Sequence, residues 1–121
     1  MSQNKPIDYL IELSKLERQS MCMQILLLLN LCEKNKAPIY IKSTVYKGRL
    51  FFDGKSMKEQ LDSPSLANFH KGLYALYDAD FIERLVVDKS GNIVFSDNYQ
   101  RNTAIIYWRL TPKALLLFGG G

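Results

Sequence analysis

The chain has 121 residues, of which 47% are hydrophobic and 12% aromatic, and its 16 Lys and Arg outweigh 12 Asp and Glu to give a formal charge of +4. This length and composition predict one domain with a hydrophobic core of its own, and they exclude disordered, collagen-like and disulfide-rich chains. The modest positive charge permits an acidic partner such as nucleic acid but does not require one.

The first predicted helix runs from residue 6 to about residue 18. Pro6 suits the first turn of a helix, and apolar side chains then repeat at helical spacing opposite charged ones. The apolar stripe consists of Ile7, Leu10 and Ile11, with Leu13 and Leu16 as its continuation. This pattern is typical of an amphipathic helix.

A second helix is expected from a Ser20 cap to about residue 34, with apolar residues on nearly its whole circumference. Its apolar run over residues 21–32 is shorter than the roughly 20 residues that a membrane-spanning helix needs, which indicates a buried core helix. Cys22 and Cys32 lie ten positions apart on this helix. That spacing separates them by about 15 Å along the axis and excludes a disulfide between them, so we expect two buried free thiols.

An aromatic β-hairpin is predicted over residues 39–53. Residues 39–46 and 49–53 are rich in β-branched or aromatic side chains, and the dipeptide Lys47-Gly48 between them is a turn signal. The aromatic side chains could stack on single-stranded bases, but packing in the core or against a partner is the favoured interpretation.

Two helices separated by a tight break are predicted over residues 56–78. Ser56 and Glu59 fit a capping box, which predicts a short helix from Ser56 to about residue 61. The tripeptide Asp62-Ser63-Pro64 then ends this helix and starts a longer one, because Ser63 can cap it and proline is tolerated at its first position. The longer helix should reach about residue 78. Its predicted core face holds Leu66, Phe69, Leu73, Leu76 and Tyr77, and its predicted outer face holds Ala67, Asn68, Lys71, Ala75 and Asp78.

A second hairpin and a last helix complete the predicted chain. Thr111 caps the last helix, Pro112 takes its first position, and glycines from Gly119 onward end it. The expected segments are a strand over 81–87, a turn over 88–92, a short strand over 93–95, a polar loop over 96–102, a strand over 103–110 and a helix over 111–118.

This order of elements is the ground plan of a winged helix-turn-helix. The stretch Asp78-Ala79-Asp80-Phe81-Ile82-Glu83-Arg84 resembles the recognition-helix exit and first wing strand of MarR- and PadR-type transcription regulators. The stretch Tyr107-Trp108-Arg109-Leu110-Thr111-Pro112-Lys113-Ala114-Leu115 resembles their closing wing strand and the helix that follows. We therefore expect an α+β winged helix-turn-helix with an extra N-terminal helix and an additional β-hairpin. The expected single domain, 1–121, comprises N-terminal helices at 6–34, the hairpin at 39–53, the helix-turn-helix at 56–78, the wing at 81–110 and a C-terminal helix at 111–118.

The resemblance implies that the longer helix enters the major groove of DNA while the wing touches the backbone or the minor groove. The implied contacts are base reading by Ser65, Asn68 and Lys71, phosphate binding by Ser63 at the helix start, wing contacts from Lys89 and Arg101, and backbone contacts from Lys55 and Lys58. If the protein forms a homodimer, we expect the first helix or the 39–53 hairpin to provide the surface.

Charge distribution is the main objection to this interpretation. Residues 39–61 carry five Lys and Arg against two acids, and residues 81–121 carry five against three, whereas residues 62–80 carry only Lys71 against three acids. Entry by the N-terminal end of the longer helix would keep Asp78 and Asp80 away from the phosphates. A winged helix that contacts another protein is therefore a serious alternative.

Sequence-specific binding to double-stranded DNA, in transcription regulation, is the favoured function. A plasmid or phage replication initiator or DNA-maintenance protein would use the same surface. An enzyme is not expected, because His70 is the only histidine and no catalytic or phosphate-binding motif is present. We expect no cofactor and no metal site, and the first six residues lack the pattern of a signal peptide, which predicts a cytoplasmic protein without a membrane segment.

Overall fold

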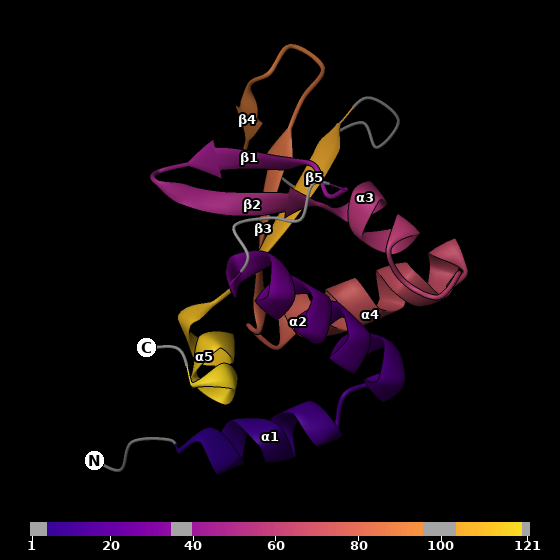
Figure 1. The fold of residues 1–121 in the computed structure, drawn as a ribbon, viewed down its shortest axis with the longest axis vertical. Helices are drawn as coiled ribbons and strands as arrows, with labels where there is room; N and C mark the ends of the chain where they lie inside the picture. Colours follow the sequence, from indigo (N-terminus) through magenta and orange to yellow (C-terminus); the bar gives the residue numbers. More distant parts are fainter. Residues whose placement is uncertain (1–4, 35–39, 96–103, 120–121) are drawn as a thin grey trace.

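An antiparallel sheet and a group of helices pack against each other in the computed structural model, which describes residues 5–34, 40–95 and 104–119 (Figure 1). The helices are α1 (Pro6–Ser14), α2 (Gln19–Lys34), α3 (Gly54–Glu59), α4 (Leu66–Asp78), α5 (Pro112–Leu115) and the 3-10 turn η1 (Leu116–Phe118). The strands are β1 (Ser43–Tyr46), β2 (Arg49–Asp53), β3 (Ile82–Val87), β4 (Ile93–Val94) and β5 (Ile105–Leu110). The predicted α+β class is confirmed.

The sheet has the strand order β1-β2-β5-β3-β4, and every neighbouring pair is antiparallel. Strand β5 pairs with β3 along its whole length, from Ile82 opposite Leu110 to Val87 opposite Ile105. Strand β2 meets β5 at only two positions, where Phe52 lies opposite Trp108 and Asp53 opposite Tyr107. The first hairpin is therefore joined to the second at one corner of the sheet.

The turn of the first hairpin is formed by Lys47 and Gly48, as predicted. Their φ angles are 52° and 75°, and two successive residues with positive φ match the right-handed twist of the flanking strands. Strand β1 begins at Ser43, later than predicted, and Ile39 lies outside the described residues.

The starts of α3 and α4 differ from the predictions. The carboxylate of Asp53 caps α3, where it accepts hydrogen bonds from the Ser56 N–H (3.1 Å) and hydroxyl (2.7 Å). The prediction that Ser56 is the cap was wrong, because β2 ends with a better-placed acceptor. Ser65 caps α4 by accepting from the Asn68 N–H (3.1 Å), and Ser63 instead occupies the turn with φ of 43°. The prediction that Ser63 and Pro64 start this helix was also wrong.

The break between the first two helices comes earlier in the chain than predicted. Helix α1 ends at Ser14 rather than near residue 18, and α2 begins at Gln19 without Ser20 as its cap. Arg18 between them has φ of 56°, a left-handed conformation that reverses the chain and that sequence periodicity does not indicate.

The core lies between α2, α4 and one face of the sheet. Of the predicted core face of α4, Phe69, Leu73 and Leu76 are buried, while Tyr77 is half-buried and Leu66 is 59% exposed. The other large buried side chains of the core include Ile25, Leu26 and Leu29 of α2, Phe52 of β2, Ile82 of β3, and Trp108 and Leu110 of β5.

The C-terminal helix is attached to the corner between α4 and β3. As predicted, Thr111 caps α5 and Pro112 occupies its first turn. The Thr111 hydroxyl donates to the Asp80 carbonyl (2.7 Å), and Lys113 Nζ donates to the Ala79 carbonyl (2.8 Å) and to Glu12 Oε1 of α1 (2.7 Å). These bonds fix α1 and α5 to the end of α4.

The close approach of α2 and α4 at Gly72 predicts the effect of one substitution. A methyl group on Gly72 would lie 2.7 Å from Met21 Cγ and 3.1 Å from Ile25 Cδ1. We expect Gly72→Ala to lower the free energy of unfolding, measured by urea denaturation, by about 1–3 kcal/mol, although alanine is the better helix former by about 1 kcal/mol.

In a Met21→Ala background, which makes room at this contact, Gly72→Ala should be much less destabilising. A stabilised Gly72→Ala single variant would contradict the close approach of the two helices.

Candidate nucleic-acid interface

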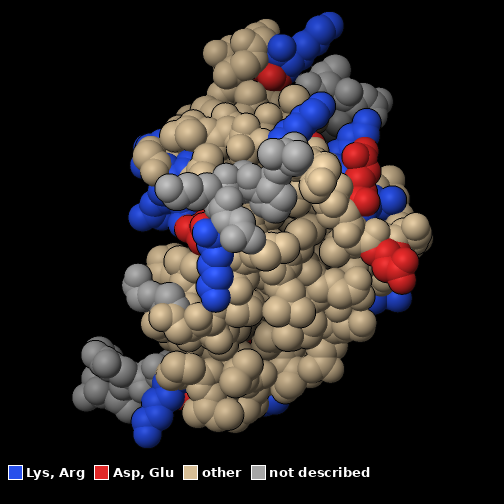
Figure 2. Space-filling model, viewed as in Figure 1, with Lys and Arg blue, Asp and Glu red and all other residues tan. Residues whose placement is uncertain are grey.

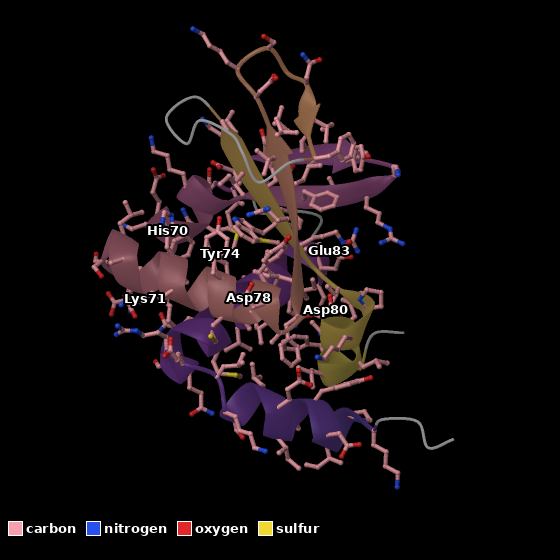
Figure 3. The ribbon with its side chains drawn as sticks, turned by 180° about the vertical axis from the view of Figure 1, so that it is seen from behind. His70, Lys71, Tyr74, Asp78, Asp80 and Glu83 are labelled. Carbon is pink, nitrogen blue, oxygen red and sulfur yellow. The ribbon has the colours of Figure 1, made fainter. Side chains whose placement is uncertain are left out.

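Helix α4 presents an outer face opposite the core. Because its buried residues occupy one side of the helix, exposed Lys71 and Asp78 lie on the other, while exposed His70 and half-buried Tyr74 lie at its edge; Figure 3 shows the four residues following one another along α4. Lys71 and Asp78 are its only residues with a formal charge. They are separated by about 10 Å along the helix axis, so the face is cationic toward its N-terminal half and anionic at its C-terminal end.

The three predicted base-reading residues do not share this face. Lys71 is exposed on it. Ser65 is exposed, but its hydroxyl already accepts from the Asn68 N–H. The Asn68 side chain is half-buried and its amide donates to Met21 Sδ (3.6 Å), so it points toward α2. A sequence signal for this orientation is Gly72 one turn later, which marks the side on which α2 packs.

A cleft of about 540 Å³ lies between α3, α4 and β5. Its lining is mainly apolar and includes Leu66, Phe69, Leu73, Ile106 and Trp108. The predicted backbone-contacting residues Lys55 and Lys58 border it from α3, together with Glu59, and His70 borders it from α4. Tyr74 also lines the cleft. The sequence predicted His70 to be a boundary histidine rather than a ligand, and it gave Tyr74 no role, although both residues follow at helical spacing from Leu66.

The turn between β3 and β4 carries the predicted wing residue Lys89. Asp88 Oδ1 accepts from the Ser90 N–H (2.9 Å) and the Asn92 N–H (2.8 Å), and Gly91 has φ of 87°. These features hold the turn in a defined shape and leave Lys89 exposed. The predicted phosphate-binding Ser63 is exposed in the turn before α4, and the other predicted wing residue, Arg101, lies outside the described residues.

Acidic side chains gather where α4 ends and β3 begins. Asp78, Asp80 and Glu83 lie together at this end in Figure 3 and line a shallow polar depression. Glu83 is paired with Arg109, whose Nε lies 3.4 Å from Glu83 Oε2. Asp78, Asp80 and Glu83 are separated along α4 from Lys55, Lys58 and Lys71, although Glu59 and exposed Asp62 belong to the cationic end and Arg84 borders the acidic depression.

Comparisons with protein families, with curated proteins and with solved structures found no match. Within residues 5–34, 40–95 and 104–119, no three His, Cys, Asp or Glu side chains are grouped so that they could hold a metal ion. In the same part of the chain, no helix has the length and apolar character to cross a membrane.

The two cysteines are buried free thiols, as predicted. Cys22 Sγ donates to the carbonyls of Glu17 (3.4 Å) and Gly72 (3.6 Å). Burial raises the pKa of each thiol from 9.0 to about 11. Both side chains are therefore neutral at physiological pH and serve as packing groups rather than nucleophiles.

This shift predicts a decline of stability in alkaline solution. In the unfolded chain the thiols ionise near pH 9, whereas the folded chain keeps its protons up to about pH 11. The free energy of unfolding should therefore fall as pH rises through this window. The Cys22→Ala/Cys32→Ala variant should lose that part of the decline, and its retention would contradict the shift.

Proposed function

We propose that the chain is a winged helix-turn-helix protein that binds double-stranded DNA sequence-specifically. Transcription regulation is the commonest task of such a module, and it is the task we propose for this chain. The observation that carries the proposal is the pairing of β2 with β5 and of β5 with β3. It joins the strand before the α3–α4 helix pair to the hairpin after it. In this proposal α4 is the recognition helix and the β3–β5 hairpin is the wing.

The charges of the described residues support an approach by the N-terminal half of α4. Lys55, Lys58 and Lys71 lie in α3 and the first half of α4, while Asp78 and Asp80 lie at the far end. Phosphates would be attracted by the first group and repelled by the second. An inserted N-terminal end satisfies both conditions, with Lys71 and His70 facing base edges and Lys89 on the backbone.

Two alternatives use the same region. A plasmid or phage replication initiator or DNA-maintenance protein would bind DNA through the same helix and wing. A winged helix that contacts another protein is favoured by the apolar lining of the α3–α4–β5 cleft and by the exposure of Leu66. This second candidate predicts no DNA affinity even at low salt.

DNA binding is tested by fluorescence anisotropy with a duplex selected from a random pool, over a range of salt concentrations. We expect Lys71→Gln to weaken binding about three- to tenfold and to reduce discrimination against other duplexes, because a major-groove cation is lost. Lys47→Gln, in the turn of the β1–β2 hairpin, is the matched control and should bind as the unaltered protein does. Equal losses in both variants, or no affinity at low salt, would overturn the proposal.

The direction of approach is tested by neutralising one acid at each end. Glu59→Gln should strengthen binding to random-sequence DNA about two- to fivefold, because it removes a repelling charge beside the phosphates. Asp78→Asn should change the affinity by less than about twofold. If the two variants gain equally, α4 does not approach DNA by its N-terminal half.

A further inference from the structure

Helix α1 turns its apolar stripe away from the rest of the protein. Ile7 is 55% exposed, Leu10 47% and Ile11 48%. The side that contacts the body of the protein consists instead of buried Leu13 and half-buried Tyr9. An amphipathic helix with its apolar side in water is unfavourable unless something covers that side.

The outward orientation of α1 is held by specific contacts. Lys113 Nζ lies 2.7 Å from Glu12 Oε1 and packs over the rings of Phe81 and Tyr9, at 4.5 Å and 5.4 Å from their centroids. The ammonium group also donates to the Ala79 carbonyl. Rotation of α1 to bury its apolar stripe would break these contacts of Lys113. The stripe therefore stays exposed in the folded protein.

Helix α2 extends the same apolar surface. No charged residue occurs between Gln19 and Cys32, and Leu27 and Leu31 on its outer side are each about half exposed. Figure 2 shows a broad area without charged side chains over α2 and α1, among the described residues of this view, with Lys and Arg gathered mainly above it. We call Ile7, Leu10, Ile11, Leu27 and Leu31 the apolar face.

We propose that the apolar face is the interface of a homodimer, in which the α1 helices of two copies pack antiparallel across a two-fold axis. Asp8 and Lys15 lie seven residues apart, about 20° from each other around the helix and about 10 Å apart along it. Both are exposed on one flank of the stripe. In an antiparallel pair, Asp8 of each copy meets Lys15 of the partner subunit, so this flank is complementary to itself.

The size of the apolar face also supports a second copy of the chain as the partner. Helix α1 has nine residues and is only about 14 Å long, which is too short to bury the roughly 800 Å² per partner of a stable interface. The uncharged side of α2 supplies further area next to it. An apolar surface with one Asp and one Lys on its flank gives no net attraction to nucleic acid, whereas a second copy presents an equally apolar surface.

The interface is tested by sedimentation equilibrium, and the test does not depend on DNA binding. The unaltered protein should have twice the monomer mass, and Leu10→Glu and Ile11→Glu should each raise the dissociation constant by about 100-fold or more, because they bury a charge. Val45→Glu is the matched control: Val45 is 65% exposed on β1 and its replacement should leave the dimer intact. A monomeric unaltered protein, or dissociation by Val45→Glu alone, overturns the proposal. Circular dichroism verifies that each variant is folded.

The antiparallel arrangement is tested by exchanging charges. Lys15→Asp should weaken the dimer about three- to tenfold, because it sets two acids against each other. Adding Asp8→Lys restores the opposite charges and should recover the affinity, even though Asp8 also caps α1 through the Lys5 N–H. A double variant as weak as Lys15→Asp overturns the antiparallel packing.

Discussion

At Gly72 the backbone of α4 comes so close to α2 that a methyl group there would lie 2.7 Å from the Met21 side chain. This approach fixes the rotation of α4 about its own axis. Phe69, Leu73 and Leu76 are thereby directed into the core, and Lys71 is directed outward. The surface available to a partner is therefore a consequence of how tightly the two longest helices pack.

The indole of Trp108 connects this helix pair to the sheet. Its ring packs edge-on against Tyr74 and Tyr77, with centroid distances of 5.6 Å and 6.0 Å, and Arg84 lies over Tyr77 at 4.8 Å. A Cβ on Gly54 would lie 2.9 Å from Trp108 Nε1, so glycine lets α3 begin directly beside the ring. Both helices of the proposed helix-turn-helix are thus held against the strand that ends the proposed wing.

Local signals in the sequence predicted most of the elements, because their causes are local. The Lys47-Gly48 turn and the Thr111-Pro112 helix start need only their own backbone preferences. The starts of α3 and α4 could not be predicted in the same way, since several residues that can cap a helix lie close together in the sequence and the tertiary fold decides between them. The orientation of Asn68 could not be predicted either, because a helical wheel of α4 alone does not show which side of that helix α2 will cover. The sequence predicted α1 to be amphipathic, but the direction in which its apolar stripe points depends on contacts with Lys113, which is distant in sequence.

The sparse charge of α4 gives the two proposals a common physical basis. One copy offers Lys55, Lys58 and Lys71, with Lys89 on the hairpin, and each phosphate neutralised contributes a salt-dependence slope of only about 0.9. A single copy would therefore bind DNA weakly, and acids close to these lysines reduce the attraction further. In the proposed dimer, a second copy joined through the apolar α1–α2 side would double the number of cations without adding any to α4. The segregation of apolar and cationic side chains onto different helices would allow one small domain to use both proposed surfaces at once.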